Sequence, residues 1–586
     1  MPLQINELTP YLSVILLKIN DLSFNINSLN TSLTSSANGF QTQNHNTDGV
    51  IYYSHYAETK KANWTTRTTI TDTTNHILIV YKFYNYLAIY HSDNSKKNKI
   101  YKLMFRSPLD HEFRKLKLIR KEVLNTAFLN GVKIKNLWLN NIDKSSEIKA
   151  DSKMLSGSNL EEALDPIGDQ TYSFSAIKVE HTDFSIGVNS SDSKIWIKKF
   201  SDGIEYFDML DSILDSIKNS DLMTQGLIYH PVSILANSHI DHTVLNNMID
   251  LELMNIENFS TTSDEYEVLN SIYPLWDTLN FTFSQQNRTF IVDVFDSNPN
   301  HIGRFELTFS NINEIIVSHV FADANYPDTL NIQQILEHKD LIKFWFEHNY
   351  TMINGFIYQQ KFRDISFSGF VWSNFTNHDV SKEKPINNNF NIIGQAQEDS
   401  LFSWVKKYWT GINPLFVDFN QANVDGWLLC DDGGNEKADF IHVTNEQIPT
   451  ISLIHVKGAN NNSANRQIST TAYEVVVSQA LKNIRYVDKN SISETIDVAP
   501  NTHVYNLVWY NGQQSSRQDF KDFLDRLPQY KKRVVVLQPH VLQNKYTVLN
   551  PTPTTKNRLN QLNALLLSAQ NTVQSLGAEF IVIGEQ

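Results

Sequence analysis

Cysteine is almost absent from this sequence: Cys430 is the only one in 586 residues. No disulfide can form within the chain, which is typical of a reducing compartment. No apolar run approaches the roughly 20 residues that a membrane-spanning helix needs. The stretch LSVILLKI (12–19) lacks the basic flank and the cleavage site of a secretory signal. These absences predict a cytoplasmic protein without a membrane segment.

A Walker A motif is also absent, so we do not expect this chain to drive ATP-dependent movement along a nucleic acid. Acidic residues outnumber basic ones, 63 to 50, which gives a net charge of −13. An acidic chain does not bind nucleic acid over its whole surface, although a local basic groove can still do so. The apolar fraction of 41% is that of a globular protein, and this length predicts about two to four domains.

Residues 91–135 carry a net positive charge, opposite in sign to the net charge of the whole chain. They contain 12 Lys or Arg and four Asp or Glu, a local net charge of +8. Within them, residues 111–128 show a helical pattern with an apolar face, and the opposite face carries Arg114, Lys115, Lys117 and Lys121. This basic segment is either a solvated helix face or a surface that follows the phosphates of a nucleic acid.

The patterns divide the chain into three regions. Residues 1–260 predict an α+β region, residues 261–385 a β-rich domain, and residues 386–586 a C-terminal α/β domain. The first region has a strand-like run at 76–91, helical patterns at 203–220 and 239–258, and a polar connector at 140–159. The middle region has two hairpin-like pairs, at 280–296 and 302–322, and the last boundary falls in the polar stretch 378–391.

The C-terminal region has a regular order of elements. We expect a helix, a three-strand meander, and then alternating helices and strands, which together predict an α/β sandwich with a mixed sheet. In sequence order the predicted elements are helix 398–409, strand 426–432, strands 439–443 and 451–457, helix 469–487, strand 502–510, helix 518–527, strand 532–540, and a last helix and strand.

Three polar side chains meet at one end of the predicted hairpin. Asp439 begins one strand, and His455 and Lys457 end the next on a common face. A carboxylate with an imidazole, or with the Val456 carbonyl, can hold a divalent cation that activates water, and a lysine beside it can stabilise a developing phosphorane charge. The alternative is a satisfied core histidine and a lysine whose stem lies along apolar surface.

The C-terminal 200 residues or so contain these three side chains. This region resembles the PD-(D/E)xK nuclease superfamily, which has a restriction-endonuclease-like fold. The pattern is an aspartate on one strand followed by (D/E)-x-K on the next, here Asp439 and then His455 and Lys457. The resemblance implies Mg²⁺ or Mn²⁺ bound at Asp439, His455 and Val456, with Glu398 or Asp399 on the first helix as a further ligand.

Histidine departs from the family pattern at position 455. It carries no negative charge and coordinates Mn²⁺ more readily than Mg²⁺. Asp432 and Glu436, in the turn before Asp439, can restore the negative charge.

The following helix resembles the RecB-like branch through Gln479, with Tyr486 seven residues on instead of the usual four. Lys482 follows Gln479 by three positions, so the two share a helix face, and Arg485 extends the row. We expect this row to line the groove beside the metal and to contact phosphate or a base; the alternative is an exposed helix rim.

The resemblance implies metal-dependent hydrolysis of phosphodiester bonds, with DNA favoured over RNA as the nucleic-acid partner. A large N-terminal region fused to such a nuclease resembles bacterial anti-phage or restriction effectors, which act with partner proteins of a defence system. Two alternatives stay open: a ribonuclease on the same scaffold, and a catalytically silent nucleic-acid-binding subunit. The sequence does not give the oligomeric state.

Overall fold

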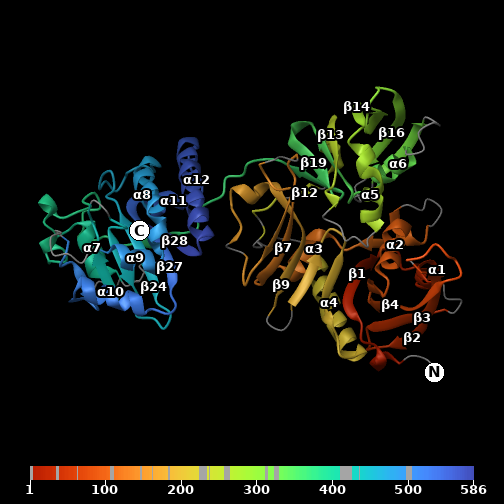
Figure 1. The fold of residues 1–586 in the computed structure, drawn as a ribbon, viewed down its shortest axis with the longest axis horizontal. Coiled ribbons are helices and arrows are strands. Elements are labelled where there is room, and N and C mark those ends of the chain that lie inside the picture. The colour runs from red at the N-terminus through yellow and green to blue at the C-terminus, as the bar shows by residue number, and fades with distance from the viewer. Residues whose placement is uncertain are drawn as a thin grey trace. The chain divides into compact units, whose positions relative to one another are not determined.

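The structure is a computed structural model, and its chain divides into two compact units (Figure 1). Unit 1 comprises Met1–Leu164 and Asp169–Phe362, and unit 2 comprises Asp165–Gly168 and Arg363–Gln586. The structure describes all residues except 1–3, 35–38, 63, 106–110, 145–147, 161–162, 182–184, 223–231, 233, 237, 240, 257–263, 310–314, 323–328, 410–424, 434–435 and 497–503.

Unit 1 begins with a large antiparallel sheet in the order β2-β3-β4-β5-β1-β11-β10-β9-β7-β8, with β6 paired to β1. Alternate residues of β1 enter two cores: Val14 and Leu16 pack with α3 and α4, whereas Ile15 and Leu17 pack with α1 and α2. The strands are β1 Tyr11–Ile19, β2 Gln41–Asn44, β3 Gly49–Lys61, β4 Thr71–Phe83, β5 Tyr86–His91, β6 Leu116–Leu118, β7 Lys133–Asn141, β8 Ser152–Ser156, β9 Tyr172–Glu180, β10 Ser185–Asn189 and β11 Lys194–Lys199, and the helices are α1 Asn27–Leu33, α2 Asn94–Phe105, α3 Lys121–Phe128 and α4 Gly203–Leu222.

The predicted helix over 111–128 is wrong in its first half. Leu116, Lys117 and Leu118 form β6, because their apolar–polar–apolar alternation fits a strand edge beside β1. Only Lys121–Phe128 is α-helical, as α3. The predicted helix at 203–220 is confirmed by α4. The polar stretch 140–159 is not a connector, because it contains β8, which pairs with β7.

The rest of unit 1 has a separate core between two smaller sheets, ordered β12-β20-β19-β18-β13 and β14-β15-β16-β17. The predicted hairpins at 280–296 and 302–322 are confirmed by the pairs β14/β15 and β16/β17. The predicted helix at 239–258 is wrong: Met248–Leu253 alternates in burial and forms β13. The elements are β12 Ser238–His239, β13 Met248–Leu253, α5 Asp264–Trp276, β14 Asn280–Gln286, β15 Thr289–Phe295, β16 His301–Phe309, β17 Ile315–Ala322, α6 Thr329–Glu337, β18 Ile342–Phe346, β19 Tyr350–Ile353 and β20 Phe356–Gln359.

Unit 2 is an α/β sandwich around a mixed sheet, as the sequence predicts. Its strand order is β21-β28-β27-β24-β23-β22-β25-β26. The meander β22-β23-β24 is antiparallel, whereas β27 is parallel to β24 and β28 is parallel to β27. The strands are β21 Phe370–Ser373, β22 Trp427–Cys430, β23 Phe440–Val443, β24 Thr450–Val456, β25 Val508–Tyr510, β26 Gln513–Gln514, β27 Lys531–Leu542 and β28 Ala578–Glu585.

Helices cover both faces of this sheet, which explains why β24 is buried along its whole length. Helices α8, α10 and α12 pack over one core and α7 packs over the other. The helices are α7 Leu401–Tyr408, α8 Thr471–Lys482, α9 Lys489–Thr495, α10 Arg517–Arg526, α11 Gln543–Tyr546 and α12 Pro553–Ser575. The division between units falls at Arg363, so residues 363–385 belong to unit 2: β21 pairs with β28, and Ala459 N donates to Val380 O at 2.7 Å.

Candidate functional site

Asp439 lies at the end of the β23–β24 hairpin, as the sequence predicts. Phe440 pairs with Ile454, so Asp439 precedes β23 beside the C-terminal end of β24. Its Oδ2 accepts a hydrogen bond from Val456 N at 2.7 Å, and the side chain is buried. Val456 therefore contributes its N–H group to the Asp439 carboxylate.

Asp432, Glu436 and Asp439 form an acidic cluster at this point. Their ligand oxygen atoms lie within 4.8 Å of one another, with Asp432 and Asp439 buried and Glu436 half-buried. Lys384 Nζ lies 2.7 Å from Asp432 Oδ1. Carboxylate oxygens at this spacing are the ligands that hard divalent cations such as Mg²⁺ and Mn²⁺ prefer. The cluster thus fits a divalent cation.

The carboxylates of the cluster destabilise each other's charge. Burial, together with the carboxylates of Glu436, Glu383 and Asp432, raises the pKa of Asp439 well above its ordinary value. Burial and the Asp432 carboxylate raise the pKa of Glu436 as well. A buried group of like charges is stabilised by a proton or by a cation, so a divalent ion bound here would relieve the repulsion.

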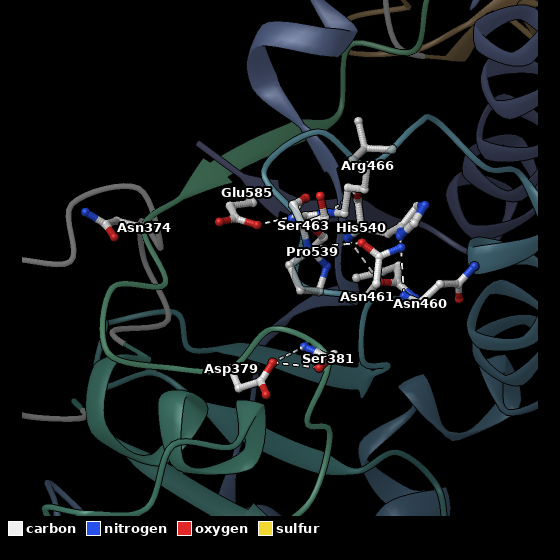
Figure 2. Close-up of polar contacts among 12 residues, drawn as sticks. Asn374, Asp379, Ser381, Asn460, Asn461, Ser463, Arg466, Pro539, His540 and Glu585 are labelled. Atoms are coloured by element: carbon white, nitrogen blue, oxygen red, sulfur yellow. Dashed lines mark hydrogen bonds and ion pairs between the residues drawn. The ribbon is translucent and has the colours of Figure 1, made fainter.

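Lys457 borders the acidic cluster through Glu383. Its Nζ lies 2.7 Å from Glu383 Oε2, and its side chain is 41% exposed. Glu383 and Lys384 are functional candidates that the sequence analysis missed, because it placed them in an interdomain boundary. The turn before them is closed by Asp379, whose Oδ1 accepts hydrogen bonds from Ser381 N and Oγ (Figure 2). The charged run SKEKP (381–385) is a sequence signal, but it does not show what the run contacts.

His455 is not one of the three cluster residues. The alternation of β24 puts it on the same side as Ile451 and Leu453, which pack under α8. It is buried, and its Nε2 has no hydrogen-bond partner among the described residues. Burial, and to a lesser extent Lys482, lower the pKa of His455 to about 3. The imidazole is therefore neutral at physiological pH, and its role as a ligand stays a prediction.

Glu398 is not one of the three cluster residues. Its carboxylate accepts hydrogen bonds from Ser400 N and Oγ at the start of α7 and pairs with Lys382 at 3.3 Å. Asp399 also pairs with Lys382. These contacts give Glu398 a role in fixing the beginning of α7.

Of the predicted row Gln479, Lys482 and Arg485, the first two residues lie on α8. Gln479 is half-buried, and Lys482 is exposed one turn later. Arg485 lies beyond α8 in a short 3₁₀ turn, where its guanidinium stacks on Tyr486 at 4.7 Å. The positive charge of Lys482 is a minor cause of the lowered pKa of His455, after burial.

The loop after β24 is held by Arg466, whose side chain is buried. Its Nε donates to His540 O at 2.7 Å, its Nη2 donates to Pro539 O, and it pairs with Glu585 (Figure 2). These contacts tie the loop to the ends of β27 and β28. A polar cavity of ≈740 Å³ lies at this edge, lined by residues that include Asn460, Gln467, Thr471, His540 and Arg558.

The basic segment 91–135 is partly paired with acidic residues of unit 1. Lys97 is buried and donates to Ser13 O, and Lys121 lies over the ring of Phe174. Arg114 and Lys117 are exposed, and Arg106 lies outside the described residues. Four other basic residues of the segment form ion pairs: Lys96–Glu58, Lys115–Glu112, Arg120–Asp221 and Lys135–Glu180. Phosphate binding by this segment stays a prediction.

The buried side chain of His442 should make the stability of unit 2 depend on pH. It is fully buried in β23, and burial lowers its pKa to about 4. Because the unfolded-state pKa is near 6.5, the unfolded state binds more protons between these values, and stability falls as pH drops from 6.5 to 4. At pH 5 this loss is about 2 kcal/mol. In His442→Gln we expect a correspondingly smaller loss between pH 7 and pH 5, measured by hydrogen exchange of β22–β24.

The exposed residue His348 provides the control, because His348→Gln should leave that pH dependence unchanged. An equal loss of stability in wild type and His442→Gln would show that His442 does not titrate in this way.

No known protein family, curated protein or solved structure matches this chain. None of the helices in the described part of the chain is both long and apolar enough to cross a membrane.

Proposed function

We propose that unit 2 is a divalent-metal-dependent nuclease with a restriction-endonuclease-like PD-(D/E)xK core. The observation that carries this proposal is the meeting of Asp432, Glu436 and Asp439 within 4.8 Å, beside the strand that leads into Lys457. The order of elements supports it: α7, the meander β22-β23-β24, α8, and then β27 parallel to β24.

Each residue has a defined role in this proposal. Asp439, Asp432 and Glu436 hold the cation, and a bound Mg²⁺ or Mn²⁺ supplies a Lewis acid at the scissile phosphate and lowers the pKa of a water molecule. Lys457 places a positive charge where the phosphorane charge develops. Glu383 orients Lys457 through their 2.7 Å contact. Lys384 offsets the charge of Asp432 until the cation binds.

Oxygen ligands from Asp432 and Glu436 change the expected choice of ion. A site centred on His455 predicts a preference for Mn²⁺, whereas three carboxylates accept Mg²⁺ and Mn²⁺ alike. The carboxylates also supply the negative charge that His455 lacks.

DNA is the proposed substrate, and a role as an anti-phage or restriction effector follows from the resemblance alone. Gln479, Lys482 and Arg485 are the proposed contacts to the nucleic acid beside the metal. A ribonuclease on the same scaffold would carry the same carboxylates. A catalytically silent subunit would bind nucleic acid without cleaving it.

The test is to incubate the full chain with plasmid, linear DNA, single-stranded DNA and RNA, each with Mg²⁺, Mn²⁺ or EDTA. We expect cleavage of DNA with either ion and none with EDTA. Lys457→Ala should lower the rate of cleavage without weakening Mn²⁺ binding, because Lys457 acts on the phosphate. Cleavage confined to RNA would establish the ribonuclease. Binding without cleavage under every condition would establish the silent subunit and refute the nuclease.

A further inference from the structure

A second group of metal-ligating side chains lies in unit 1, on the first sheet. Glu58 is on β3, His76 is on β4, and Asp93 follows the end of β5 by two residues. One ligand atom from each lies within 4.8 Å of the others. We propose that Glu58, His76 and Asp93 bind one divalent transition-metal ion of the zinc class.

The ligands are placed by the pairing of the strands. Tyr56 is opposite His76 in the β3–β4 register, and Leu78 is opposite His91 in the β4–β5 register. His76 is 8% exposed, and its Nε2 lies 3.6 Å from Glu58 Oε2. Glu58 Oε2 also lies 3.0 Å from Lys60 Nζ. An imidazole nitrogen and a carboxylate oxygen therefore face each other, with the His76 side chain buried and the Glu58 side chain 20% exposed.

A second layer of contacts orients the ligands. Asp93 N donates to His91 Nδ1 at 2.9 Å, and His91 Nε2 lies 3.0 Å from Tyr56 Oη. Because neutral His91 accepts at Nδ1, its proton is on Nε2 and is donated to Tyr56. Ser92 Oγ lies 3.4 Å from His76 Nδ1. Of these contacts, the one from Ser92 reaches a ligand side chain, and such partners fix ligand orientation in metal sites.

Two lysines now neutralise Glu58. Lys96 Nζ lies 2.7 Å from Oε1 and Lys60 Nζ lies 3.0 Å from Oε2. Lys60 is 59% exposed and can leave without disturbing the sheet. A metal ion at this site competes with these ammonium groups for the same carboxylate, so removal of Lys96 should strengthen metal binding.

The ligand set selects the ion. One imidazole and two carboxylates suit Zn²⁺ better than Mg²⁺, which prefers oxygen alone. Three protein ligands also leave a fourth position for water or another ligand.

The experiment is a Zn²⁺ titration of the full chain against a chromophoric chelator, in an Asp439→Asn background that weakens the acidic cluster of unit 2. We expect one bound Zn²⁺ whose affinity falls about tenfold or more in His76→Ala and in Asp93→Asn. Lys96→Gln should raise that affinity.

His55→Ala is the matched control, since His55 is an exposed residue of β3 on the opposite face from Glu58. It should bind Zn²⁺ as the parent does. Equal Zn²⁺ affinity in the parent, folded Asp93→Asn and Lys96→Gln would overturn the proposal, whether or not His76→Ala folds. Loss of this site leaves nuclease activity unaffected, so the two proposals fail separately.

Discussion

Asp439→Asn should reduce metal-dependent cleavage by about 100-fold or more, because a bound cation supplies several kcal/mol of transition-state stabilisation. Asparagine has the shape of aspartate, and its side-chain oxygen can still accept the hydrogen bond from Val456 N. The substitution removes a charge that neighbouring carboxylates and burial destabilise. The variant should therefore lose activity while unit 2 becomes as stable as wild type or more so.

Asp425→Asn is the matched control. Asp425 Oδ1 accepts from Asn445 Nδ2 at 2.8 Å, at the opposite end of β23 from Asp439. Its cleavage rate should equal that of wild type. The assignment of Asp439 is wrong if folded Asp439→Asn cleaves at the wild-type rate.

Arg517→Met should lower the free energy of unfolding of unit 2 by about 3–5 kcal/mol, the usual cost of removing one partner from a buried ion pair. The Arg517 side chain is 1% exposed and lies 3.1 Å from Asp431 Oδ1. It also donates to Cys430 O at 2.6 Å. Asp431 in turn pairs with Lys437. Without Arg517, Asp431 loses a cationic partner and the Cys430 carbonyl loses a donor, both in the core.

Hydrogen exchange of peptides from β22 and β23 measures this loss, and Arg526→Met on the exposed side of the same helix is the control. The second substitution Asp431→Asn, added to Arg517→Met, should not recover the stability, because it removes the carboxylate that pairs with the buried Lys437. If Arg517→Met proves as stable as Arg526→Met, the ion pair does not contribute to the fold.

Local patterns predicted the order of most elements of unit 2, because these are apolar segments separated by clear turns. The strand predicted over 502–510 is shorter: β25 is Val508–Tyr510, and residues 502–503 lie outside the described residues. The hairpin β23–β24 and the position of Asp439 follow from strand alternation alone. The same reasoning failed at Leu116–Leu118 and Met248–Leu253, where the prediction assigned a short alternation of apolar and polar residues to a longer helical pattern. In both places pairing with a distant strand decided the outcome.

Which residues surround the acidic cluster of unit 2 depends on contacts between segments far apart in the sequence, and local sequence patterns do not reveal such contacts. Glu383 and Lys384 reach it because their segment is hydrogen-bonded to the loop after β24. Glu398, a candidate ligand because of its predicted place on the first helix, contacts Ser400 and Lys382, and its role as a ligand stays a prediction. The excess charge of residues 91–135 was visible in the sequence, but the acidic partners Glu58, Asp221 and Glu180 come from other strands and helices.

The most direct test of the metal-dependent site counts the Mn²⁺ ions bound to the protein, from the electron paramagnetic resonance signal of the free ion. The comparison is between the chain with and without Asp432→Asn, Glu436→Gln and Asp439→Asn together, both in a His76→Ala background that weakens the unit 1 site. We predict that the triple variant binds one Mn²⁺ fewer and no longer cleaves nucleic acid. The same number of bound ions, at the same affinity, would contradict the assignment of the acidic cluster as the metal site.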